Sequence, residues 1–368
     1  MKIAIIRKEC SFRMGGAERY AANLSRALAD LGHTVLMLAE RCDDDVHPAL
    51  IHVPIKVDHW SSWAKNLSFH RNSQRALAGL KADVVIALSR SFPADAFRVS
   101  DPLHDYWMGI RYPGAVHRFL QRLNPRHRAI LALEKGIFDP ANTRFVITNS
   151  KLSKRLIPES HPFPLDRIHV IYNGVDLVKF RPGPNAAVAG YGPARLLFVG
   201  QDFKRKGLRP LLEALAIVSS RGNRFELRVI GRDDSGPYRK LAASLGILDA
   251  ISFEGASTSI QEAYQKAELF VFPSLYDPFA NVCLEALACG LPVLTTTTNG
   301  SSEIITEGAD GHVVDGAETG LAGRLADVIS RFSEMEPADR YAMRTAARRK
   351  AEQFTIEANA LKIVELLS

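Results

Sequence analysis

The sequence predicts an α/β protein built from two doubly wound domains that face a cleft, and three observations support this. Short apolar runs, typical of buried strands, alternate with amphipathic helical stretches along the whole chain. The alternation stops at a segment rich in glycine and proline, 181–193, and then restarts. The length of 368 residues also exceeds what one ordinary hydrophobic core supports. Ligands of such domains bind at the carboxyl ends of the strands, so we expect the functional residues there, facing the cleft.

The first half begins with an apolar strand at 2–7, and a loop that contains Gly15 and Gly16 follows it. A helix is expected at 17–31, because apolar residues recur there at helical spacing and Gly32 can end it. This strand-helix alternation predicts a parallel sheet. The further strands expected in this half are 34–39, 83–88, 145–148 and 168–172.

The second half repeats the pattern. A helix is expected from about Ala280 to Gly290, and the stretch 339–367 is helical without carrying a motif. The strands expected in this half are 195–200, 225–230, 251–254, 269–272 and 292–296.

These patterns predict four segments along the chain. The first domain is expected to span 1–175, a linker 176–194 and the second domain 195–345. A C-terminal helix at 346–368 can pack back on the first domain.

The composition fits a soluble globular protein, with 46% hydrophobic and 24% charged residues. No apolar run approaches the roughly 20 residues of a membrane span, and the first residues enter a strand without a signal-peptide layout. The cysteines are scattered without zinc spacing, so we expect them to be reduced and buried, as in a cytosolic protein. They are Cys10, Cys42, Cys283 and Cys289.

The positive charge is concentrated in the first half. Residues 1–172 hold 25 Lys and Arg against 16 Asp and Glu, a net charge of +9, whereas the remainder holds 22 against 24, a net charge of −2. Ten of the eleven histidines also lie in the first part. The first domain is therefore expected to bind an anionic partner, which can be a phosphorylated acceptor, a lipid surface or nucleic acid.

One short stretch in the second half carries the most specific chemistry. Asp277 lies in a loop between a buried strand and a helix, and Glu285 lies about one turn inside that helix. Backbone N–H groups at a helix start lack intrahelical partners and can hold a phosphate, while two carboxylates can accept from sugar hydroxyls. The combination predicts a nucleotide-sugar site. The loop and helix-start residues expected to bind the donor are Phe279, Ala280, Asn281 and Val282.

A basic pair, Arg205 and Lys206, follows the first strand of the second half and precedes Gly207. A solvated turn is the alternative interpretation of such a pair. The position of the pair at a strand end favours a binding role over a solvated turn, because the two cations can neutralise a leaving diphosphate. Arg offers a planar fork of donors, and Lys offers a point charge.

The order of these motifs resembles that of glycosyltransferase family 4, retaining enzymes of the GT-B fold with two Rossmann-like domains. Within the family, the chain is most similar to the branch of glucosyltransferases that act on the lipopolysaccharide core. The resemblance implies a hexosyltransferase that uses a UDP- or ADP-type sugar, with UDP-glucose favoured, and that needs no metal ion or other cofactor. The motifs that carry it are Gly15-Gly16-Ala17-Glu18-Arg19, Asn173-Gly174-Val175-Asp176, Gly200 with Arg205-Lys206-Gly207, and Asp277 with Glu285-Ala286.

The resemblance also implies roles for single residues. Glu285 would hold the ribose hydroxyls, and Asp277, where the family usually has Glu, would hold hydroxyls of the donor sugar. Gly15 and Gly16 would lie against the donor phosphate and the acceptor, since glycine lets the backbone approach closely.

Asp101 matches a position where many family members have His and the lipopolysaccharide branch has Asp. The resemblance implies that it contacts the C6 hydroxyl of the sugar or steadies an oxocarbenium-like centre. His104 and Asp105 are alternatives for this role.

The stretch 104–135 interleaves basic residues with aromatic ones, which suits an anionic membrane surface or a phosphorylated lipopolysaccharide core. The alternative is a solvated basic helix packed by its apolar face. The location expected is cytoplasmic, peripherally associated with the inner face of the cytoplasmic membrane. The contact residues expected are Tyr106, Trp107, Arg111, Arg118 and Arg122.

Other functions stay open at this point. The main alternative is a family 4 enzyme acting on a different glycolipid or polysaccharide acceptor. A catalytically silent nucleotide-sugar binder, a nucleotide-sugar epimerase and a nucleic-acid-binding protein are further ones. The last lacks any recognised nucleic-acid module, so no nucleic-acid partner is expected.

Overall fold

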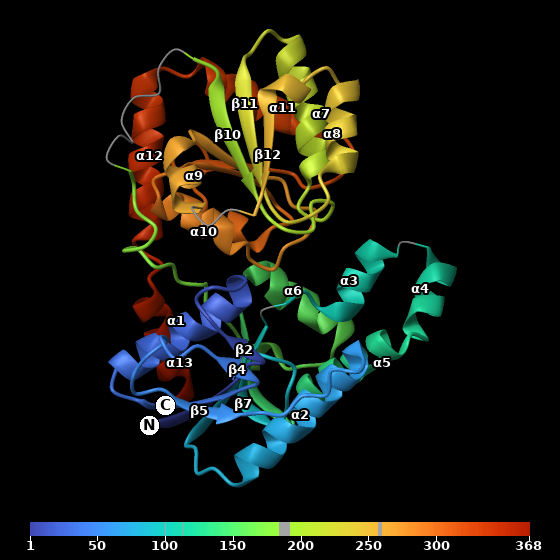
Figure 1. Ribbon diagram of the computed structural model, residues 1–368, viewed down its shortest axis with the longest axis vertical. Helices are drawn as coiled ribbons and strands as arrows, with labels where there is room; N and C mark the ends of the chain where they lie inside the picture. The colour runs from blue at the N-terminus through green and yellow to red at the C-terminus, as the bar shows by residue number, and fades with distance from the viewer. Residues whose placement is uncertain (100, 113, 184–191, 257–259) are drawn as a thin grey trace. The chain divides into compact units, whose positions relative to one another are not determined.

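The computed structural model describes residues 1–99, 101–112, 114–183, 192–256 and 260–368. The chain divides into two compact units (Figure 1). Unit 1 comprises Met1–Asn173 and Ile356–Ser368, and unit 2 comprises Gly174–Thr355. Each unit is built on one parallel sheet with helices packed against it, so the predicted α/β architecture is confirmed.

The sheet of unit 1 has seven parallel strands in the order β5-β3-β1-β6-β7-β8-β9. The strand order reverses between β1 and β6, which leaves a crevice at their carboxyl ends. A separate parallel pair is formed by β2 (Glu9–Cys10) and β4 (Arg41–Cys42). The strands of the sheet are β1 (Lys2–Ile6), β3 (Thr34–Ala39), β5 (Ile51–Pro54), β6 (Val84–Ala87), β7 (Ala94–Val99), β8 (Thr143–Thr148) and β9 (Ile168–Val170).

The helices of unit 1 include one from each end of the unit, α1 (Gly16–Asp30) and α13 (Ile356–Leu367). These two helices lie side by side (Figure 1). Leu24 and Leu28 of α1 share a core with Ile363 of α13. The other helices are α2 (Ser62–Ala78), α3 (His104–Arg111), α4 (Ala115–Arg122), α5 (Pro125–Ile137), α6 (Lys151–Ser160) and the 3₁₀ turn η1 (Leu165–Arg167).

Unit 2 has six parallel strands in the order β12-β11-β10-β13-β14-β15, and its strand order reverses between β10 and β13. The strands are β10 (Ala194–Val199), β11 (Phe225–Ile230), β12 (Ile251–Gly255), β13 (Leu269–Phe272), β14 (Val293–Thr296) and β15 (Gly311–Val314). The helices are α7 (Leu208–Ser220), α8 (Gly236–Ser244), η2 (Leu248–Ala250), α9 (Ile260–Lys266), α10 (Asn281–Ala288), η3 (Gly300–Ile304), α11 (Leu321–Glu334) and α12 (Pro337–Ala351).

The C-terminal stretch is helical over most of 339–367, but the helix expected at 346–368 is divided between the end of α12 in unit 2 and α13 in unit 1. The N–H of Val175 donates to the carbonyl of Phe354 at 2.9 Å, and Val175 forms an isolated bridge with Thr355. An extended backbone at these residues cannot continue the helix, so the chain leaves unit 2 there.

Where the structure describes it, the expected linker 176–194 is part of unit 2, and its last residue, Ala194, begins β10. Phe180 is buried and its carbonyl accepts from Nη1 of Arg348 at 3.0 Å. Residues 184–191 of the linker lie outside the described residues. The unit boundary falls after Asn173, two residues before the expected end of the first domain.

The expected strands are present to within about two residues, and β2, β4, β5, β7 and β15 add to them. The sequence did not predict β7 because polar residues interrupt its apolar run. They have partners inside the fold: Oδ2 of Asp95 accepts from the N–H of Val85 at 2.8 Å, and the buried guanidinium of Arg98 lies 3.6 Å from the ring centre of Tyr20. Such partners allow polar groups in a buried strand.

In the parts of the chain that the structure describes, no helix has the length and apolarity to cross a membrane.

One glycine between β10 and α7 gives a stability prediction. Gly207 has φ +78°, and a Cβ added there would lie 1.9 Å from the carbonyl oxygen of Pro273. We expect Gly207→Ala to lower the free energy of unfolding in urea by roughly 3 kcal/mol, because a left-handed φ and a backbone clash coincide. Gly222→Ala is the matched control, since Gly222 has φ +83° with nothing within 4 Å of its added Cβ, and we expect a loss of about 1 kcal/mol there. Equal losses in the two variants would contradict the clash.

Candidate functional site

The predicted donor residues of unit 2 come from the loops that follow β10 and β13, the neighbouring strands where the strand order reverses, and from the helix α10 after the second loop. The loop after β10 carries Arg205 and Lys206, and the loop after β13 carries Asp277. In doubly wound sheets this place is a crevice outside the carboxyl ends of the strands, and ligands bind in it. The topology therefore brings the two predicted motifs together.

The loop after β10 is held in one shape by its own side chains. Asp202 adopts φ +59°, and its carboxylate accepts from Nε of Arg205 at 2.9 Å. The other end of the guanidinium, Nη1, donates to the carbonyl of Tyr276 at 3.0 Å. Arg205 is thus fixed between the two loops, with 22% of its side chain exposed, rather than lying on a solvated turn.

Lys206 and Asp277 form a buried ion pair that joins the two loops. Nζ of Lys206 contacts Oδ2 of Asp277, and their side chains are 13% and 9% exposed. Nη1 of Arg205 lies 3.8 Å from the same oxygen. Burial lowers the pKa of Lys206, the charge of Asp277 opposes this shift, and that of Arg205 adds to it. One carboxylate is therefore shared by two cations.

The loop that carries Asp277 is positioned by Asn299, a residue that was not predicted from the sequence. Oδ1 of Asn299 accepts from the N–H groups of Ala280 at 3.2 Å and Ser301 at 3.1 Å, and Nδ2 donates to Oγ1 of Thr295 at 2.9 Å. Asn299 is fully buried. The signal in the sequence is a polar run of Thr and Asn directly after a predicted strand.

The predicted donor helix α10 begins at Asn281, one residue later than expected, and ends at Ala288. The N–H of Phe279 donates to Oδ1 of Asp277 at 3.1 Å and that of Ala280 to Asn299. These two N–H groups are therefore used within the protein. That the donor phosphate meets backbone N–H groups at this helix start stays a prediction.

Glu285 is buried on α10, and its Oε2 accepts from the hydroxyl of Tyr264 at 3.2 Å. Tyr264 belongs to α9, is fully buried and packs edge-to-face on Phe180 and Phe270. Tyr264 was not predicted from the sequence, because its separation from Glu285 along the chain does not indicate a contact. This hydroxyl holds one side of the carboxylate.

In unit 1, Gly15 is the N-cap of α1, which begins at Gly16. Its φ of −66° needs no glycine, but a Cβ at this position would lie 2.9 Å from Oε2 of Glu18. The other oxygen of Glu18 accepts from Nη2 of Arg7 at 2.7 Å. The glycine therefore leaves room for this carboxylate, and close approach of a ligand to Gly15 and Gly16 stays a prediction.

Asp101 follows β7 and has 51% of its side chain exposed, with Oδ2 3.5 Å from Nη1 of Arg90. Arg90 is held more firmly by the buried Glu134, which accepts from Nε at 3.0 Å and Nη2 at 2.9 Å. Asp101 is thus an accessible carboxylate beside a fixed cation.

The two alternatives to Asp101, namely His104 and Asp105, already have partners within the protein. The buried ring of His104 hydrogen-bonds that of His127 at 2.9 Å, and burial together with the charge of Arg90 lowers the pKa of His104 to about 3. Asp105 pairs with Arg122 at 2.5 Å. Asp101 is therefore the most available of the three for a ligand.

The predicted acceptor and membrane residues lie on α3 and α4, at the outer edge of unit 1 (Figure 1). Trp107 stacks on His104 with ring centres 5.5 Å apart, while Tyr106 and Arg118 are half-buried and Arg111 is exposed. No residue of α4 is buried. The alternative of a basic helix packed by its apolar face is therefore wrong for α4, whose apolar face is open. That face, called here the α4 apolar face, comprises Val116, Phe119, Leu120 and the C-cap residue Leu123.

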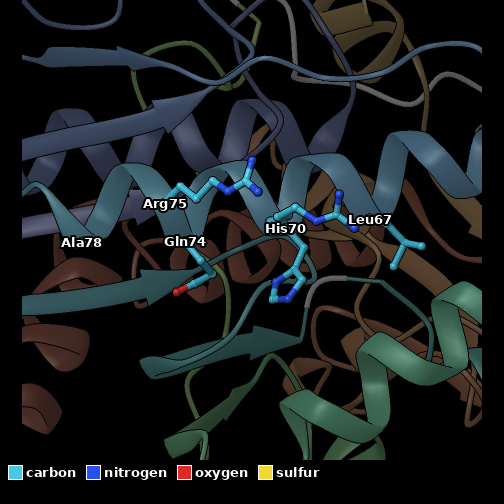
Figure 2. A pocket seen from close by; sticks show the side chains of 6 residues that line it. Leu67, His70, Gln74, Arg75 and Ala78 are labelled. Carbon is cyan, nitrogen blue, oxygen red and sulfur yellow. The ribbon is translucent and has the colours of Figure 1, made fainter.

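A hollow runs along α2 (Figure 2), and its lining comes from that helix alone: Leu67, His70, Arg71, Gln74, Arg75 and Ala78. None of the predicted site residues lies in it. Within the described ranges, no group of three or more His, Cys, Asp or Glu has an arrangement that can hold a metal ion.

Two sequence profiles cover both halves of the chain. Residues 188–350 match the family "Glycosyl transferases group 1", and residues 14–179 match "Glycosyltransferase Family 4". The chain belongs to glycosyltransferase family 4.

Relatives with assigned activities agree with this family. A D-inositol 3-phosphate glycosyltransferase of Thermobispora bispora is 27% identical over 96% of this chain and 89% of its own. The lipopolysaccharide glucosyltransferase WaaG of Escherichia coli K12 is 27% identical over 89% of this chain and 88% of its own. The prediction of a glycosyltransferase enzyme is confirmed.

Solved structures agree on the fold. A crystal structure of WaaG covers 100% of this chain and 99% of its own with TM-score 0.82 at 23% identity. Alr3699/HepE of Anabaena, solved with UDP-glucose, covers 100% and 99% with TM-score 0.73 at 17% identity. The GT-B fold predicted for this family 4 member is confirmed.

The buried pair gives a double-mutant prediction. Asp277→Asn keeps an acceptor for the N–H of Phe279 but leaves Lys206 buried without its carboxylate, so we expect the free energy of unfolding to fall by about 3 kcal/mol. Adding Lys206→Met should restore at least about half of that loss, because the uncompensated charge is then gone. Urea unfolding of the wild type, both single variants and the double variant measures the coupling. Additive losses would show that the two side chains do not act as a pair.

Proposed function

We propose that this family 4 enzyme is a retaining hexosyltransferase that moves glucose from UDP-glucose to a lipid-linked or lipopolysaccharide-core acceptor. The observation that carries the proposal is the convergence of Arg205, Lys206 and Asp277 at the sheet reversal of unit 2, with the buried Glu285 on the adjoining helix. The activity of the Escherichia coli relative supports the acceptor, and the UDP-glucose complex of the Anabaena structure supports the donor.

The cations have the chemistry that a departing nucleotide needs. Breaking the glycosidic bond leaves negative charge on a diphosphate, and fixed cations near that charge stabilise the transition state. Arg205 is anchored by Asp202 and the carbonyl of Tyr276, so its guanidinium needs little reordering to meet the diphosphate. We propose that Arg205 and Lys206 do the work of a divalent metal ion and that no cofactor takes part.

The two acids have the chemistry that the sugar parts of the donor need. An ionised carboxylate has about four acceptor positions, so Glu285 can accept from Tyr264 and still hold a vicinal diol. We assign the ribose hydroxyls to Glu285. Asp277 already accepts from Lys206 and Phe279, and we assign its remaining acceptor positions to hydroxyls of the transferred sugar.

Transfer with retention follows from the family resemblance. We propose that the leaving phosphate itself takes the proton of the acceptor hydroxyl, so that no side chain acts as a nucleophile. Asp101 is assigned to the C6 hydroxyl or to the oxocarbenium-like centre of the sugar, since its carboxylate is accessible and its charge is balanced by Arg90.

The α4 apolar face supports a peripheral membrane location. Its residues recur at helical spacing on one side of α4, and each is more than half exposed. Arg111, Arg118 and Arg122 lie near it in the sequence. Apolar side chains flanked by arginines suit the boundary of an anionic membrane, where lipid-linked acceptors are found.

A phosphorylated polyol is a second candidate acceptor. The Thermobispora bispora relative is a D-inositol 3-phosphate glycosyltransferase and matches 96% of this chain. The basic excess of residues 1–172 suits such an acceptor as well as it suits a lipid surface.

The donor assignment predicts ligand-dependent stabilisation. UDP-glucose at about 100 times its Kd should stabilise the protein by about 2.7 kcal/mol, which a thermal-shift assay detects. Glu285→Ala should abolish both the shift and glucose transfer while the fold is kept, because the ribose loses its acceptor. Glu262→Ala, at an exposed acid of α9, is the control and should behave as the wild type. Near-normal turnover in Glu285→Ala would remove Glu285 from the site.

The membrane assignment predicts vesicle binding. Phe119→Glu should weaken sedimentation with phosphatidylglycerol-containing vesicles by about tenfold or more, because an exposed aromatic side chain that would enter the membrane boundary is replaced by a charge. Val178→Glu makes the same charge change at an exposed apolar residue of unit 2 and should leave binding unchanged. Equal binding by the two variants would exclude α4 as the contact.

A further inference from the structure

The sheet of unit 1 has its own reversal, between β1 and β6, and the residues that follow these two strands are basic. Arg7 and Lys8 follow β1, and Arg90 comes soon after β6. The backbone N–H of Lys8 donates to Oγ of Ser89 at 3.2 Å, which ties the two loops together. The crevice at the carboxyl ends of strands is where such sheets bind ligands.

Lys8 is partly enclosed there by the beginning of α2. Its Nζ donates to Oδ1 of Asn66 at 2.6 Å and lies 5.9 Å from the ring centre of Phe69. Asn66 is itself held, since its Nδ2 donates to the carbonyl of Ser62 at 2.8 Å. An ammonium group has three N–H donors, so a neutral amide oxygen alone does not saturate it.

The charges around Lys8 are mostly of its own sign. Burial lowers the pKa of Lys8, and the charges of Lys65 on α2, Arg90 after β6 and Arg7 after β1 lower it further, to about 8; Asp101 after β7 opposes them. Across the described residues, neither Lys8 nor Lys65 forms an ion pair with a carboxylate.

The acids of this region face the arginines, and Asp101, which also acts on Lys8, lies 3.5 Å from Nη1 of Arg90. Glu18 pairs with Arg7 at 2.7 Å, and the buried Glu134 pairs with Arg90 at 2.9 Å. The two lysines therefore keep an excess of positive charge at a partly enclosed position. Without an anion, like charges at such a place are unfavourable, and a functional site is where such an arrangement is expected.

We propose that Lys8 and Lys65, with Asn66 orienting Lys8, bind a phosphate group, namely a phosphomonoester carried by the acceptor. Two lysines match the two negative charges of a phosphomonoester better than the single charge of a carboxylate. The inference rests on the proposed function, and it narrows the acceptor to a phosphorylated one. It also distinguishes this site from the donor residues, which belong to unit 2.

Inorganic phosphate is the probe, because it shares the chemistry without presupposing a sugar. Titration calorimetry with the full chain should detect binding at millimolar phosphate or below. Lys8→Met should weaken it by about tenfold to a hundredfold and Lys65→Met by about tenfold, the loss expected for charge-assisted hydrogen bonds. Lys81→Met, at an exposed lysine of the same unit, should bind as the wild type. Equal affinity in wild type and Lys8→Met would overturn the inference.

The pH dependence of phosphate binding distinguishes a Lys8 that binds the anion from a Lys8 that only supports the fold. As pH rises through about 8, free Lys8 loses its proton, so the affinity of the wild type for phosphate should fall. Lys8→Arg should keep the affinity at neutral pH and abolish this fall, because a guanidinium stays charged. A wild-type affinity that is flat from pH 7 to 9 would contradict the role of Lys8.

UDP-glucose separates this inference from the proposed function. We expect saturating UDP-glucose to leave phosphate binding unchanged and Lys8→Met to leave the UDP-glucose thermal shift unchanged. Competition between UDP-glucose and phosphate would assign Lys8 and Lys65 to the donor diphosphate and overturn their assignment to the acceptor. Absence of phosphate binding with a normal UDP-glucose shift would overturn the inference alone, whereas absence of the shift in the wild type would remove the proposed donor.

Discussion

The ion pair between Lys206 and Asp277 joins the two loops on which the candidate donor site depends. Two charged side chains that are almost fully buried are stable only in close contact, because each loses its hydration. The pair therefore requires a close approach of the loops after β10 and β13. Gly207, with its backbone against Pro273, and Asn299, which holds the N–H groups of Ala280 and Ser301, make that approach possible.

The two units repeat one topology with different chemistry at the strand reversal. In unit 2, the cations Arg205 and Lys206 are balanced by Asp277 and lie near a second buried acid, Glu285. In unit 1, no carboxylate of the described residues forms an ion pair with Lys8 or Lys65, which agrees with the net charge of +9 over residues 1–172. A balanced site suits a ligand with both phosphates and hydroxyls, and an unbalanced one suits an anion.

The sequence predicted much of the candidate donor site because its motifs are local. Arg205 and Lys206 are adjacent, and Asp277 and Glu285 lie on one loop and the helix that follows it. Strand β7 was missed because Asp95 and Arg98 break its apolar pattern. Asn299, Tyr264 and Lys8 were missed because each acts through partners distant in sequence: Ala280, Glu285 and Asn66.

By itself, the sequence determined the α/β class, the two-domain organisation and the family, since these follow from the alternation of apolar runs and the order of short motifs. Only the tertiary structure decided which charges are paired. It places Lys206 on Asp277 and Arg90 on Glu134, and it leaves Lys8 among cations. The physical reason is that burial and charge compensation depend on contacts between segments, which hydrophobic periodicity along one segment does not encode.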